Sequence, residues 1–117
     1  MNANIKQAAA YLRRAAEDMK HEIDTLKHQI DDMHRGGNDD IGKKEMMIAA
    51  SEKRLKESDK TGDRMIMHDQ IKGLAHEIDR AKSSISQDVT NAEQTIRDYE
   101  GRMHQLLQLA GDLENQA

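Results

Sequence analysis

The chain of 117 residues contains no cysteine, proline, phenylalanine or tryptophan. Without cysteine, a disulfide framework and a zinc site with thiolate ligands are both excluded. Without proline, the strongest helix breaker is missing from the whole chain. Tyr11 and Tyr99 are the only aromatic residues, so a wide globular core would have little bulky material to fill it. Ile, Leu, Met and Ala suit narrow contacts between helices instead, and we expect an all-α protein.

Charge is abundant but is not concentrated in a basic block. The chain has 22 acidic and 18 basic residues and a net charge of -4. Contacts with nucleic-acid phosphates need clustered basic residues, and two distant tyrosines make no platform for stacked bases. No apolar window approaches the roughly 20 residues of a membrane span, and the N-terminus lacks the apolar segment of a signal peptide. We therefore expect no nucleic-acid partner, no membrane span and a cytoplasmic location.

The clearest pattern lies in residues 1–35, where apolar residues recur in alternating steps of four and three. This spacing is a heptad seam, whose a and d positions face a partner helix. The outward positions carry opposite charges one turn apart, such as Arg13 and Glu17. The pattern predicts a helix over 3–35. Its interaction seam includes Leu12, Met19, Ile23, Leu26 and Ile30.

Residues 36–40 read Gly-Gly-Asn-Asp-Asp and carry the signals of one helix ending and another beginning. Either glycine could adopt the left-handed conformation that closes a helix, and either aspartate could cap the next one. The pattern predicts a turn at 36–40 and a second helix over 41–58. Poor helix formers in 59–63 predict a break before the chain becomes helical again.

The seam resumes at Met67 and continues to the C-terminal region. Between Ile85 and Val89 it takes a second successive step of four, a stutter that locally unwinds a supercoil. Because several serines lie nearby, residues 83–88 could hold either this stutter or a turn. We predict helical structure over 64–115, with seam residues Ile71, Leu74, Ile78, Ile85, Ile96, Met103 and Leu106.

Two architectures are consistent with these elements. One is an antiparallel coiled-coil bundle of three, possibly four, long helices, and the other is a helical hairpin followed by one very long helix. In both, residues 1–117 form a single helical domain. In the second architecture, the unpaired half of the very long helix exposes an apolar stripe, and such a stripe is a binding surface. In either architecture we expect a homo-oligomer, with a dimer favoured, or another helical protein as partner.

Six histidines raise the question of a metal site. His21 and His28 lie two turns apart on one helix face and are the candidates for binding Zn²⁺ or Ni²⁺. In the derived seam, however, both occupy solvent-side positions. No metalloprotease motif, phosphate-binding loop or nucleophile elbow is present. We expect no enzyme activity and no cofactor, and keep a small metal- or ligand-binding bundle as the alternative function.

Some apolar residues lie off the seam. Residues 46–50 are apolar on every side of the helix, and the Leu-rich segment near the C-terminus widens the stripe in the same way. Methionine is flexible and adapts to partner surfaces. We predict a non-enzymatic helical interaction or scaffold module that associates with itself through its seams. The candidate partner patch comprises Met46, Met47, Ile48, Leu107 and Leu109.

Overall fold

A computed structural model describes residues 2–116, and within this range the protein consists of two α-helices and no strand. Helix α1 spans Asn2–Glu57 and helix α2 spans Thr61–Gln116. The prediction of an all-α protein is confirmed. Three residues, 58–60, connect the two helices.

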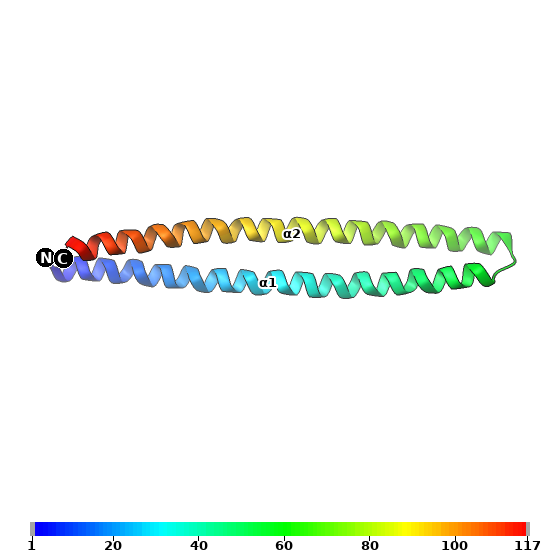
Figure 1. Ribbon diagram of the computed structural model, residues 1–117, viewed down its shortest axis with the longest axis horizontal. Helices are drawn as coiled ribbons and strands as arrows, with labels where there is room; N and C mark the ends of the chain where they lie inside the picture. The colour runs from blue at the N-terminus through cyan, green and yellow to red at the C-terminus, as the bar shows by residue number, and fades with distance from the viewer. Residues whose placement is uncertain (1, 117) are drawn as a thin grey trace. The chain divides into compact units, whose positions relative to one another are not determined.

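The helices form two units, each made of one part of α1 and one part of α2 (Figure 1). Unit 1 combines α1 as far as Asp31 with α2 from Thr90 onward. Its two segments lie side by side, because Arg13 and Glu114 are hydrogen-bonded across 101 positions of sequence. Unit 2 comprises residues 32–89 and is a helical hairpin closed by the connection between α1 and α2.

The predicted turn at 36–40 is wrong, because α1 continues through these residues without interruption. No glycine within residues 2–116 adopts a positive φ, so neither Gly36 nor Gly37 closes a helix. Each glycine costs a helix about 1 kcal/mol relative to alanine, which weakens the segment without breaking it. Asp40 does not start a new helix either. Its carboxylate pairs instead with Lys44, one turn further along α1, at 3.1 Å.

Packing against α2 explains why the helix persists at this place. Gly37 is half-buried, and a Cβ atom built on it would lie 2.1 Å from Ile85 Cδ1. The α1 seam therefore runs from Met33 through Gly37 to Ile41 in two steps of four, which makes it a stutter. The α2 stutter is centred on Ile85, so the two stutters lie opposite each other in unit 2. The missing side chain of Gly37 leaves the space that Ile85 occupies.

The predicted break at 59–63 lies close to the observed connection, which is shorter. Thr61 already belongs to α2, and the Arg64 N–H donates a hydrogen bond of 3.0 Å to the Lys60 carbonyl. The two helix ends at the connection carry charges that match the helix dipoles. Arg54 and Lys56 lie in the last turn of α1, and Asp63 lies in the first turn of α2.

Residues 83–88 are helical, so α2 does not turn back there and the stutter is accommodated inside the helix. With no turn at 36–40 or 83–88, the described chain forms neither three helices nor a short hairpin followed by one long helix. Seam residues of α1 and α2 are buried or half-buried inside each unit. The predicted bundle of three or four helices is not confirmed, whereas a hairpin of two helices is compatible with the structure. The helix-ending signals of the glycines are weaker than the packing that the continuous seam provides.

The core of each unit is a narrow strip. Its buried residues are Ala9, Ala16, Ile23, Ile96 and Ala110 in unit 1, and Ile41, Ile78 and Val89 in unit 2. Ile23, the most buried isoleucine, keeps 4% of its surface exposed, and most other seam residues are only half-buried. Two helices alone enclose small side chains such as Ala110 but leave larger ones partly exposed. The seam therefore stabilises each pair and still leaves apolar edges accessible.

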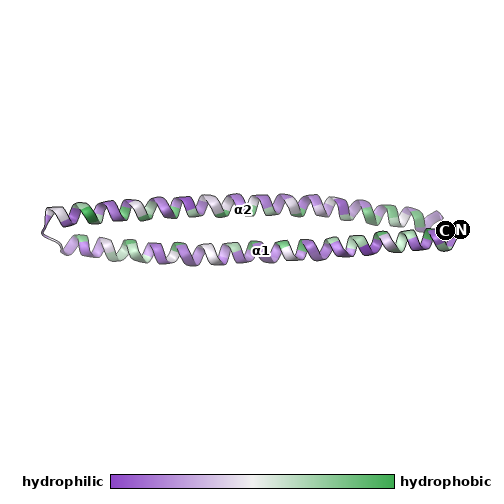
Figure 2. Ribbon diagram, turned by 180° about the vertical axis from the view of Figure 1, so that it is seen from behind, coloured by the Kyte–Doolittle hydropathy of each residue, from purple (hydrophilic) through white to green (hydrophobic). Residues whose placement is uncertain are grey.

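Hydrophobic and hydrophilic residues are interspersed along both helices (Figure 2). Neither described helix contains a segment apolar and long enough to cross a membrane.

Candidate interaction surface

Every residue predicted to form the interaction seam is buried or half-buried within its own unit. Ile23, Ile78 and Ile96 are buried. The half-buried members are Leu12, Met19, Leu26, Ile30, Ile71, Leu74, Ile85, Met103 and Leu106. The helices of one chain therefore cover part of this surface, and the residues beside the seam are the more accessible ones.

Large apolar side chains beside the seam are exposed, and they are most numerous in unit 2. Met46 is 75% exposed and Met47 is 55% exposed, whereas Ile48 belongs to the seam and is half-buried. Across the hairpin, Met65 and Ile66 are also exposed. In unit 1 the exposed apolar residues are Tyr11, Leu107 and Leu109.

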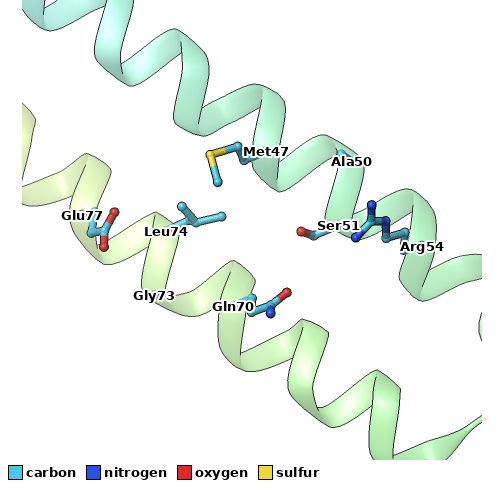
Figure 3. Close-up of a pocket in the computed structure, with 8 residues that line it drawn as sticks. All are labelled: Met47, Ala50, Ser51, Arg54, Gln70, Gly73, Leu74 and Glu77. Carbon is cyan, nitrogen blue, oxygen red and sulfur yellow. The ribbon is translucent and has the colours of Figure 1, made fainter.

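A groove of about 520 Å³ lies between α1 and α2 in unit 2, near the connection (Figure 3). Met47 and Leu74 point toward each other across it. Ala50 and Gly73 widen it because they carry little or no side chain, and a Cβ built on Gly73 would meet no atom within 4 Å. The remaining lining residues are Ser51, Arg54, Gln70 and Glu77.

A smaller groove of about 180 Å³ adjoins the first and extends it toward the connection. It shares Arg54 and Gln70 with the larger groove and adds Ile66, Met67 and Asp63. Apolar surface from both helices is thus continuous along one side of the hairpin.

The two sides of unit 2 differ in chemistry. Residues that immediately precede a seam residue line the groove, and we call them the groove flank: Met47, Ala50 and Arg54 on α1, with Ile66, Gln70, Gly73 and Glu77 on α2. Residues that immediately follow a seam residue form the opposite flank, which includes Glu45, Ala49, Glu52, His68, Lys72 and Ala75, all exposed. The groove flank combines large apolar side chains with a depression.

Lys44 occupies a seam position yet carries a charge. Its ammonium group reaches out of the seam to Asp40 at 3.1 Å and to Glu77 at 3.7 Å. The long aliphatic stem can cover apolar surface while the charge stays near water. This contact ties α1 to α2 at one end of the groove and holds Glu77 at its edge.

In unit 1 the clearest polar contact is the pair formed by Arg13 and Glu114. Arg13 Nε donates to the two carboxylate oxygens of Glu114 at 3.1 and 3.3 Å, and a second guanidinium nitrogen also binds the carboxylate. The hydrogen bond from Arg13 lowers the pKa of Glu114, and the hydrogen bond to Glu114 raises the pKa of Arg13. Both side chains are about half exposed, so water and salt screen the pair.

We expect Arg13→Gln to raise the pKa of Glu114, because the variant removes the charged donor. In the wild type, the lowered pKa gives stability that is present above the unfolded-state pKa and is lost as the pH falls through the folded-state value. Carbon-13 NMR titration of the Glu114 carboxyl group measures this directly. Arg14→Gln is the matched control, and an equal shift in both variants would contradict the assigned pair.

The metal candidates His21 and His28 are both exposed on α1 in unit 1. The backbone carbonyl of His21 accepts a hydrogen bond of 3.0 Å from the Thr25 hydroxyl. Nowhere between residues 2 and 116 do three or more His, Asp or Glu side chains gather in an arrangement that could hold a metal ion. Metal binding by these two histidines stays a prediction.

Sequence reasoning missed two features of this region. It did not place Gly37 in the seam, although counting steps of four from Met33 to Ile41 gives the same stutter that is recognisable around Ile85. It also left Ile66 out of the candidate patch. Ile66 immediately precedes the seam residue Met67, and that position beside the seam was the available signal.

Comparison of the chain with protein-family models, with curated proteins and with solved structures finds no match in any of the three.

Proposed function

We propose that this chain is a non-enzymatic helical interaction or scaffold module, and that unit 2 provides its binding surface. The observation that carries this proposal is the groove flank, where Met47 and Ile66 from opposite helices are exposed beside a groove. Clustered apolar surface next to polar residues is typical of sites that bind other proteins.

The heptad spacing supports a further part of the proposal, namely that each helix pair is a coiled coil. Its seam joins α1 to α2, so the pair acts as a rigid support for the residues on its flanks. Methionines on such a support can adjust to the shape of a partner helix, because their side chains are unbranched and flexible.

A photo-reactive residue introduced at Ile66 tests the proposed function in the cells that naturally make this protein. We expect ultraviolet light to link position 66 covalently to a protein, because Ile66 lies at the edge of the groove. The same residue at Lys72, which is also exposed but lies on the opposite flank, is the control and should give little product. Equal yields from the two positions, or no protein adduct from position 66, would contradict the proposal.

A further inference from the structure

We infer that the groove flank of unit 2 binds the same flank of a second copy, with the two connections at the same end, to form four helices. This inference rests on the proposed function and identifies the partner of the same surface. Three properties of the flank support it: its apolar lining, its shape and the order of its charges.

The register within the hairpin fixes which residues lie level with each other. Lys44 contacts Glu77, and Gly37 lies against Ile85. The helices are therefore antiparallel, so moving one residue forward in α1 moves the residue opposite it one position back in α2. By this register Gly73 lies within two residues of the level of Met47. In the same way Glu77 lies within two residues of the level of Lys43, and Arg80 within two residues of the level of Asp40; all of these residues immediately precede a seam residue.

A twofold axis parallel to the hairpin would lay α1 of one copy on α2 of the other at the same level. Lys43 would then meet Glu77 of the second copy, and Asp40 would meet Arg80. Met47 would meet Gly73, where the structure leaves open space for a side chain. Each contact would occur twice, because a twofold interface uses the same surface on both copies.

The reversed orientation brings like charges together. With the connections at opposite ends and the grooves centred on each other, α1 would lie on α1 of the second copy. Lys43 would then lie near Arg54 and Asp40 near Glu57, both pairs of like charge. The parallel orientation forms two pairs of opposite charge, Lys43 with Glu77 and Asp40 with Arg80, against one pair of like charge, Glu57 with Asp63. Like charges at a contact disfavour an arrangement, so the charges select the orientation with adjacent connections.

A second copy would also cover core residues that the hairpin leaves partly exposed. Leu74 and Met67 belong to the seam, line the grooves and are only half-buried. Four-helix bundles cover such residues by adding a second pair of helices across the first. The opposite flank carries the exposed charged residues Glu45, Glu52 and Lys72 instead.

Sedimentation equilibrium on the full chain tests the inference with two variants. Gly73→Lys places a long charged side chain in the groove, at a position where a built Cβ atom meets no other atom within 4 Å. Ala75→Lys places the same side chain on the opposite flank. We expect a concentration-dependent dimer for the wild type and for Ala75→Lys. For Gly73→Lys we expect a dissociation constant raised about a hundredfold or more, because the change enters a symmetric interface twice.

Circular dichroism of each variant separates loss of binding from loss of folding, and Gly73→Lys should keep full helicity. Orientation is tested by Asp59→Cys in the connection, since the natural chain has no cysteine. We expect oxidation to link two copies through position 59. A wild-type monomer at every concentration, a dimer unaffected by Gly73→Lys, or absence of the disulfide would overturn the inference. If the wild type is monomeric while position 66 still links to a different protein, the inference fails and the proposed function stands.

Discussion

Ile23→Asp is expected to destabilise unit 1 by at least about 3 kcal/mol, the largest single effect that we predict. Ile23 is the most buried isoleucine in the chain, at 4% exposure, and belongs to the unit 1 seam. Aspartate would lose the apolar contacts and would bring an unpaired carboxylate into the strip between two helices. Urea titration followed by circular dichroism measures the change in the free energy of unfolding.

The control for this experiment is His28→Asp, which adds the same carboxylate to an exposed position on the same helix. We expect a change within about 0.5 kcal/mol, as is usual at exposed positions away from special contacts. Hydrogen exchange adds spatial resolution. Amides around Ile96, in the α2 segment of the same unit, should lose protection in Ile23→Asp and keep it in the control. Equal stability of the two variants would show that the heptad register of α1 is wrong.

Gly37→Leu is expected to destabilise unit 2 by about 2–3 kcal/mol, whereas Gly36→Leu should stabilise it by up to about 1 kcal/mol. The two glycines are adjacent and have the same intrinsic helix propensity. Around Gly36 a built Cβ meets no atom within 4 Å, whereas at Gly37 it would lie 2.1 Å from Ile85 Cδ1 and 2.9 Å from Ile85 Cγ1. The opposite signs follow from packing alone, because leucine favours a helix at both positions. Thermal and urea unfolding measure both changes.

Exchange of the large and small residues tests the contact itself. In Gly37→Leu/Ile85→Ala the large side chain lies on α1 and the small one on α2, so the double variant should recover part of the lost stability. For residues in direct contact, we expect the double variant to deviate from additivity by about 0.5–3 kcal/mol. Strict additivity of the two single changes would contradict a contact between Gly37 and Ile85.

Most of the fold was predictable from the spacing of apolar residues. Steps of four and three placed Ile23, Ile78 and Ile96 in a seam, and all three are buried. Missing prolines and aromatics indicated long helices with narrow contacts, and poor helix formers marked the region of the connection. The spacing of apolar residues and the local composition depend only on nearby positions in the chain, so one sequence is enough to recognise them.

The Gly-Gly-Asn-Asp-Asp segment shows why the architecture was not predictable in the same way. Its glycines and aspartates are strong signals for a helix end, and their effect on a helix is about 1 kcal/mol per glycine. Whether the helix continues depends on Ile85, which lies 48 positions further along the chain than Gly37. A preference read from neighbouring residues cannot include this distant contact, and here the tertiary contact prevails.

The candidate surface was predictable in part for a similar reason. Residues 46–50 were recognised because they are apolar on every side of one helix. Gly73 and Ile66 carry no such signal alone, and they matter because the register of unit 2 brings them to the same groove flank as Met47. A surface made by two helices needs the pairing of the helices as well as the pattern of each.

The central claim is that α1 continues through Gly37 and packs there against Ile85 of α2. The most direct measurement is a nuclear Overhauser effect between the Gly37 Hα protons and the Ile85 δ-methyl group in an isotope-labelled sample. We predict a strong cross-peak, together with helical chemical shifts throughout residues 33–41. Absence of the cross-peak, with turn-like shifts at Gly36 and Gly37, would contradict the paired stutters and would return the chain to a three-helix arrangement.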